Sequence, residues 1–177
     1  MAGYTREQLG SLVNLSETVI RNLENERAQR PDLYRNYKIR AAFEKIGISF
    51  YVVDAISLGV WYDDIEMAVL HSFQGKPPQQ LRMPGRVVRA GREMIGLTIR
   101  QFAPVTGLSI GAIQPLEQGL IDRPNLTTLA ILEKAFEDHG LKYLTEDGIP
   151  IGIAYENTEI AQKYAPGVDP KKPGTPP

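Results

Sequence analysis

The sequence contains no cysteine, only two histidines and one tryptophan, and no long apolar run. Without cysteine there can be no disulfide, no thiol nucleophile and no zinc–thiolate site. No segment is apolar for long enough to span a bilayer, and the N-terminus lacks a basic stretch followed by an apolar one, so we predict neither a membrane helix nor a signal peptide. These absences favour a cytoplasmic protein.

A strong net charge is also lacking, because the 177 residues sum to −1 at pH 7. The chain as a whole is therefore not attracted to nucleic acid. The charge is unevenly distributed, however. Residues 82–100 contain five arginines and one acid, whereas residues 101–160 contain nine acids and three basic residues. We expect any contact with DNA to be local, with the acidic surface turned away from it.

Patterns typical of catalysis or metal binding are absent too. His71 and His139 have no metal-ligand spacing, and His139 falls in the last turn of a predicted helix, where a cation suits the helix dipole. Asp63, Asp64 and Glu66 lack a ligand loop and are better explained as acids at a helix N-terminus. No glycine-rich phosphate loop follows a predicted strand. We expect no enzymatic activity, no cofactor and no metal.

One folding unit is present twice. Aligned with itself at an offset of 93 residues, the chain matches without a gap from Gly3/Gly96 to Ala68/Ala161, and 21 of these 66 positions are identical. A fixed period of this length indicates a duplicated unit. We place the first unit at residues 1–73 and the second at residues 86–164.

Two further segments differ in composition. Residues 74–85 contain three prolines and two glycines and are predicted to form an extended linker. Residues 165–177 contain five prolines and are expected to be disordered.

Helical periodicity and helix-end residues predict four helices in the second unit. Two of them contain an interior proline, Pro104 and Pro115, each of which costs a helix about 3 kcal/mol. The expected N-caps are Thr98, Ser109 and Asn125, and the expected C-terminal glycines are Gly107, Gly119 and Gly140. The helices are predicted over 86–95, 99–106, 110–118 and 126–139.

The apolar period changes from 3.6 to 2 after Gly140, which predicts a β-hairpin. Asp147 and Gly148 both tolerate the positive φ of a two-residue turn. Apolar residues then alternate from Ile149 to Tyr155, and a short helix over 158–164 follows.

The first unit repeats this order but lacks a counterpart to the helix over 86–95, since Met1 aligns with Met94. Either it is a shorter unit, or another segment covers the same groove, for which residues 65–73 are a candidate. Trp61 and Tyr62 are expected either to form an interface or to cover the core. Its predicted elements are helices over 6–13, 17–26, 33–46 and 65–73, capped where identified by Thr5, Ser16 and Asp32, and strands over 48–53 and 56–62.

Short motifs at the helix turns carry a family resemblance. They are Gly96-Leu97-Thr98, Phe102-Ala103, Gly107-Leu108-Ser109, Ile113 and Leu116-Glu117-x-Gly119 in the second unit, and Leu15-Ser16, Ile20 and Leu23-Glu24 in the first. This pattern resembles the phage-repressor (Cro-like, XRE-type) helix-turn-helix family. The trailing strands look like a bacterial branch of that family in which a C-terminal β-element serves in pairing. The resemblance implies a mainly α fold with small β content: two tandem lambda-repressor-like helix-turn-helix units, each followed by a β-hairpin.

The resemblance further implies that the third helix of each complete unit lies in the DNA major groove, while helix N-termini and arginines hold phosphates. The alternative is that these polar and basic side chains form ordinary solvated helix faces. The candidate DNA-binding residues are Arg6, Ser16, Glu17, Thr18, Arg21, Asn22 and Arg27 in the first unit, and Arg86, Arg89, Arg92, Arg100, Gln101, Ser109 and Gln114 in the second.

The second unit departs from the family pattern. The outward positions of its third helix, Ile110, Gly111 and Gln114, carry no charge, and Pro104 and Pro115 interrupt two helices. The region around Ile110 therefore suits either weak base contact or a protein-binding surface.

We predict a sequence-specific DNA-binding transcriptional regulator, with repression by occlusion as the simplest mechanism. The two units would form an intrachain pseudo-dimer through their hairpins and bind an imperfect palindrome, because the halves differ. The alternative is a protein-interaction module, such as an anti-activator that binds another transcription factor and no longer reads DNA. Unpaired hairpin edges also suit a homodimer, and Pro150 would block one edge because it lacks a donor.

Overall fold

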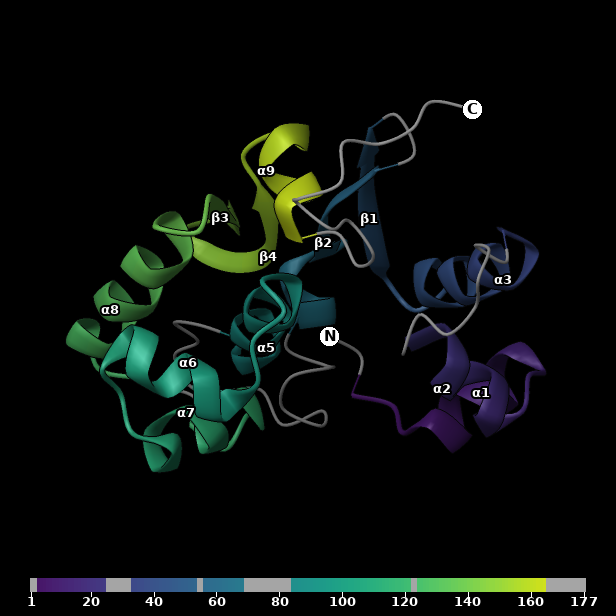
Figure 1. The fold of residues 1–177 in the computed structure, drawn as a ribbon, viewed down its shortest axis with the longest axis horizontal. Coiled ribbons are helices and arrows are strands. Elements are labelled where there is room, and N and C mark those ends of the chain that lie inside the picture. The colour runs from purple at the N-terminus through teal and green to yellow at the C-terminus, as the bar shows by residue number, and fades with distance from the viewer. Residues whose placement is uncertain (1–2, 25–32, 54–55, 69–83, 122–123, 165–177) are drawn as a thin grey trace.

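The computed structural model describes residues 3–24, 33–53, 56–68, 84–121 and 124–164, and is mainly helical with one small antiparallel sheet (Figure 1). None of the helices in these ranges is long and apolar enough to cross a membrane. The first unit contains α1 (Arg6–Val13), α2 (Glu17–Glu24), α3 (Leu33–Glu44), β1 (Ile48–Val53) and β2 (Ile56–Tyr62). The second contains α5 (Gly85–Met94), α6 (Ile99–Thr106), α7 (Ile110–Glu117), α8 (Leu126–Glu137), β3 (Leu141–Glu146), β4 (Ile149–Tyr155) and α9 (Thr158–Tyr164).

Each of the five elements from α1 to β2 recurs 93 residues later with both ends unchanged, as α6, α7, α8, β3 and β4. The local chemistry recurs as well. Thr5 and Gln8 form a capping box at the start of α1, and Thr98 and Gln101 form the same box at the start of α6. Such caps satisfy helix N–H groups that have no partner within the helix, and each is typically worth about 1 kcal/mol. The duplication predicted from the sequence is thus visible in the structure.

Both interior prolines are accommodated within helices. Pro104 and Pro115 are each the sixth residue of an eight-residue helix. Each removes one backbone N–H, which would otherwise donate to the residue four positions earlier. The helices are stabilised at their starts by the side chains of Thr98 and Ser109 and end near Gly107 and Gly119, both with positive φ.

The sheet joins the two units, with strand order β1-β2-β4-β3. The central strands pair antiparallel, with Val60 opposite Ile153, Gly59 opposite Ala154 and Trp61 opposite Gly152. Val60 and Ile153 are equivalent positions of the repeat, and the flanking pairs exchange under the same offset. An approximate local two-fold axis therefore passes through the Val60–Ile153 pair, and the predicted pairing of the hairpins is confirmed.

The same symmetry extends to the irregularities of the hairpins. The register shifts between Tyr51 and Val52 in β1, and 93 residues later between Leu144 and Thr145 in β3. The residues skipped by the pairing are Leu58 in β2 and Ile151 in β4, so the two irregularities lie at equivalent places in the central strands.

The buried apolar residues of the described ranges form two separate cores. The larger is built from the second unit and the sheet, and includes Phe102, Phe136 and Ile153, each at most 1% exposed. The smaller lies in the first unit and contains Val13, Ile20 and Ala42. The difference arises from α5, which packs on α7, α8 and β4 and has no equivalent in the described part of the first unit.

Two expectations about the elements are corrected. The linker expected over 74–85 ends earlier, because Pro84 is at the N-cap position of α5 and Gly85 is its buried first residue. Pro150 lies opposite Thr145 of β3, outside the stretch of β4 at 152–154 that pairs with β2. Residues 65–68 form a helical turn that packs on Gly47 as α9 packs on Gly140. This turn is therefore the counterpart of the start of α9, not of α5.

The remaining predicted segments, including Asp32, residues 69–73 and the tail, lie outside the described residues. Trp61 faces Gly152 at the central strand pair, whereas Tyr62 is fully buried in the larger core.

Candidate nucleic-acid interface

The α2 helix presents a polar face to solvent. A turn at Asn14, which has φ 55°, separates it from α1, and the Ser16 hydroxyl accepts a hydrogen bond from the Val19 N–H at 3.3 Å. Ile20 is 1% exposed and anchors the helix to the smaller core. The predicted base-contacting residues lie on the opposite side and are all exposed: Glu17, Thr18, Arg21 and Asn22.

Arg6, at the start of α1, is also exposed, but its side chain is engaged. Its Nε atom donates to the Glu24 carboxylate at 2.5 Å. Hydrogen bonding to this carboxylate, and its charge, raise the pKa of Arg6 further. Arg6 could bind a phosphate only after breaking its ion pair with Glu24.

The α7 helix follows α6 through the turn at Gly107, and its outer face is nearly apolar. Ile110, Gly111 and Gln114 are exposed there, as predicted. The Ser109 hydroxyl accepts from the Ala112 N–H, and Gln101 is held in the α6 capping box. Two of the predicted contact residues in this unit are therefore engaged as helix caps, while Gln114 faces solvent.

Arg92 corrects the expectation of a basic stripe along α5. It is 9% exposed, and its Nε and one terminal nitrogen donate to the two Glu117 oxygens at 2.7 and 2.9 Å. A third nitrogen donates to the Leu97 carbonyl at 2.7 Å. Because α5 is packed against α7, this guanidinium lies inside the fold and is not offered to phosphate.

The other predicted arginines differ in their exposure and in their ion pairs. Arg89 is exposed and pairs with Glu93 at 2.8 Å. Arg86 is half-buried, with its guanidinium against Gly3. Arg100 is exposed and forms no ion pair within the described ranges. Arg27 lies outside the described residues.

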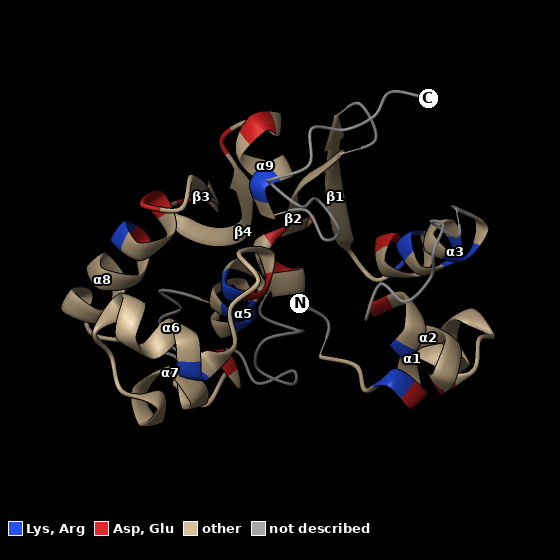
Figure 2. Ribbon diagram, viewed as in Figure 1, with Lys and Arg blue, Asp and Glu red and all other residues tan. Residues whose placement is uncertain are grey.

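Seen down the shortest axis, the α1–α2 and α6–α7 pairs both lie in the lower half of the view, on the right and left of the sheet respectively (Figure 1). Basic residues mark the first turns of α1 and α6, namely Arg6 and Arg100 (Figure 2). Acidic residues are grouped around the start of α9, in the upper part of the same view. Acidic residues also lie on α1, α2 and α3, so the acids are not confined to one part of the molecule (Figure 2).

Sequence reasoning missed the structural role of Glu117. A signal for it was present, since Leu-Glu ends the equivalent helices α2 and α7, at Glu24 and Glu117. An identical acid at two otherwise divergent helix ends indicates a shared partner. In both units that partner is an arginine, but from a different element in each.

The described residues include no cluster of three or more histidine, aspartate or glutamate side chains that could hold a metal ion. Asp64 instead accepts a hydrogen bond from the Met67 N–H at 2.7 Å and caps the turn at 65–68. His139 lies just beyond α8, with Nδ1 at 2.7 Å from the Ala135 carbonyl oxygen.

No protein-family model matches the chain, and no curated protein matches it.

Proposed function

We propose that this protein is a sequence-specific DNA-binding regulator that reads duplex DNA with α2 and α7 as the two halves of an intrachain pseudo-dimer. The observation that carries the proposal is the local two-fold axis through Val60 and Ile153. DNA-reading dimers place equivalent helices about one helical turn, ~34 Å, apart across such an axis. Here the central strands of a single chain provide the symmetry that two subunits usually provide.

The chemistry of the two exposed faces favours an imperfect palindrome. Arg21 and Gln114 are equivalent positions of the repeat, and both are exposed. Arginine forms its best paired hydrogen bonds with guanine and glutamine with adenine. The two half-sites would therefore differ at the base pair read from this position. The neighbouring residues reinforce the difference, since Glu17 and Thr18 in α2 correspond to Ile110 and Gly111 in α7.

The test is selection of binding sites from a random duplex library by the full chain, followed by gel-shift assays at about 50 mM salt, where phosphate contacts are strongest. Replacing both Arg21 and Asn22 with alanine should abolish selectivity in one half-site. Arg40→Ala provides the matched control, because it removes a positive charge from α3, where Arg40 pairs with Glu44 at 2.7 Å. Selection of no common sequence by the native chain would refute the proposal.

A second candidate function, helix capture from another protein, is favoured by the lower burial of the end of α2 compared with the end of α7. In the second unit α5 covers Leu116 and shields Glu117, whose side chain is 6% exposed. In the first unit Leu23 is only half-buried and the Glu24 side chain is 46% exposed. An amphipathic helix with an arginine near its end, like α5, would bury Leu23 and pair with Glu24.

The two functions predict different effects of the same variant. Glu24→Gln should weaken capture of a partner helix, because the arginine loses its carboxylate, while leaving DNA selectivity in the second half-site unchanged. A synthetic peptide with the α5 sequence is a suitable probe. Its binding to the native chain, and its loss in Glu24→Gln, would support helix capture; equal binding to both proteins would contradict it.

A further inference from the structure

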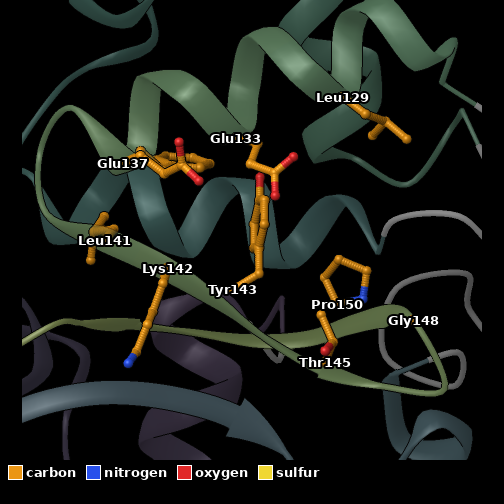
Figure 3. A pocket seen from close by; sticks show the side chains of 10 residues that line it. Leu129, Glu133, Glu137, Leu141, Lys142, Tyr143, Thr145, Gly148 and Pro150 are labelled. Atoms are coloured by element: carbon orange, nitrogen blue, oxygen red, sulfur yellow. The ribbon is translucent and has the colours of Figure 1, made fainter.

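A cavity of about 310 Å³ opens between α8 and the β3–β4 hairpin, and no residue of α2 or α7 lines it. Figure 3 shows the Tyr143 ring extending from β3 toward α8, close to the Glu133 side chain, while Lys142 extends away. Cavities of this volume are at the small end of those that hold organic ligands in proteins. The lining residues are Leu129, Glu133, Phe136, Glu137, Leu141, Lys142, Tyr143, Thr145, Gly148 and Pro150.

The Tyr143 hydroxyl in this cavity is buried and has no hydrogen-bond partner among the described residues. Burial, and secondarily the charge of Glu133, raise the pKa of Tyr143, so the hydroxyl is neutral throughout the physiological range. Burying a hydroxyl without a hydrogen-bond partner costs stability. A hydroxyl retained at that cost indicates a partner other than the chain itself.

The first unit provides an internal comparison. Its residue equivalent to Tyr143 is Phe50, which packs on Phe43 at a ring separation of 6.0 Å, much as Tyr143 packs on Phe136 at 5.7 Å. The ring contact at this place therefore does not require the hydroxyl. The position of Glu133 is taken in the first unit by Arg40, which pairs with Glu44.

Both polar groups beside the cavity are thus specific to the second unit. Glu133 and Tyr143 lie between Leu141 on one side and Leu129 and Pro150 on the other (Figure 3). A protonated amine can donate to the Glu133 carboxylate and to the Tyr143 oxygen at once. The apolar side chains that line the cavity would cover the carbon body of the same molecule.

We infer that this cavity is a binding site for a small primary amine with an apolar body, held by Glu133 and Tyr143. The site is independent of the DNA-binding proposal, because it is assembled from α8, β3 and β4 and can be measured on the free protein.

The experiment titrates the full-length protein with butylamine, benzylamine, phenethylamine and tryptamine, and follows amide chemical shifts by NMR. We expect saturable binding of at least one amine, with shifts in α8 and β3. The alcohol analogue of that amine should bind at least about tenfold more weakly, because the charge-assisted hydrogen bond is lost. Glu133→Gln should reduce the affinity for the amine by about tenfold or more, and Tyr143→Phe should reduce it by less.

Glu159→Gln is the matched control, since Glu159 is an exposed acid in the first turn of α9, outside the cavity. Thermal unfolding checks that each variant is folded, and Tyr143→Phe should be at least as stable as the native chain because Phe50 already fills the equivalent place. The inference is overturned if none of the four amines saturates by about 10 mM, a range that includes even millimolar affinities. It is also overturned if Glu133→Gln and Glu159→Gln bind the amine equally.

Discussion

Glu24 and Glu117 occupy the same position of the repeat, yet one carboxylate is exposed beside Arg6 and the other is buried beneath Arg92. The difference follows from α5, which packs on α7 and has no equivalent in the described part of the first unit. The equivalent acid is therefore exposed in one ion pair and buried in the other. Comparing the two pairs measures how burial changes the contribution of an ion pair to stability.

Arg92→Ala should destabilise the fold by about 3–5 kcal/mol, because it leaves the Glu117 charge buried without a partner. Urea denaturation followed by circular dichroism measures the free energy of unfolding. Replacing both residues with methionine should recover most of the loss, since no unpaired charge remains. Arg6→Ala is the control: it breaks the exposed pair and should leave the free energy of unfolding nearly unchanged. Equal effects of Arg92→Ala and Arg6→Ala would contradict this account of burial.

Gly152→Ala should destabilise the chain by about 1–3 kcal/mol through overcrowding. A Cβ atom at Gly152 would lie 2.2 Å from the Trp61 Cβ, and one at the equivalent Gly59 would lie 2.5 Å from the Ala154 Cβ. The central strands approach each other across these two glycines.

A glycine-to-alanine substitution in α7 should have the opposite effect on stability. A Cβ atom at Gly111 would meet only the Ser109 Oγ, at 3.8 Å, so Gly111→Ala should stabilise the helix by about 0.5–1 kcal/mol. Thermal unfolding of both variants compares the two signs directly. Stabilisation by Gly152→Ala would show that the central strands are not packed as described.

The free energy of unfolding should be nearly constant at neutral pH and fall above about pH 10. Burial raises the pKa of Tyr143 and of Tyr155 above the ordinary value of 10.0. The unfolded chain therefore releases these protons first, and the stability that they contribute below pH 10 is lost as the pH rises toward the folded-state values. The expected slope is up to about 1.4 kcal/mol per pH unit for each tyrosine.

Urea denaturation at a series of pH values checks this dependence. Tyr143→Phe should reduce the slope, whereas Tyr34→Phe removes a hydroxyl from a side chain that is 68% exposed and should leave it unchanged. A slope that is the same in both variants would show that Tyr143 is not buried in solution.

Arg21→Gln should make the two selected half-sites more alike, because Gln114 is the equivalent residue in α7. The expected change is a preference for adenine in place of guanine at one base pair, worth about 1–3 kcal/mol. Site selection with the variant, compared with Arg40→Gln as a control on α3, measures it. An unchanged selected site would remove Arg21 from the base-reading face.

The sequence allowed the helices and hairpins to be predicted well because their signals are local. Thr98, Ser109 and Asn125 cap helices as expected, and the turns at Gly107 and Gly140 have positive φ. The repeat added confirmation, since each element could be read twice. The pairing of the two hairpins was also predicted, but not that β2 and β4 would be the strands that meet.

Contacts between distant elements could not be predicted in the same way. Arg92 has the sequence neighbours of an exposed helical arginine, and only the packing of α5 on α7 brings it to Glu117. Likewise, whether the Tyr143 hydroxyl has a hydrogen-bond partner depends on how α8 packs against the hairpin. Periodicity assigns a residue to a face but does not say what lies opposite that face.

The covalent connection between the two halves of the sheet has a consequence for how the protein can change. In a dimer of identical chains, every substitution alters both halves at once. Here a substitution in β2 or α2 leaves β4 and α7 untouched, and dilution cannot separate the halves. The sequence of each half can therefore change independently of the other. The difference between Arg21 and Gln114, at equivalent positions, is a change of that kind.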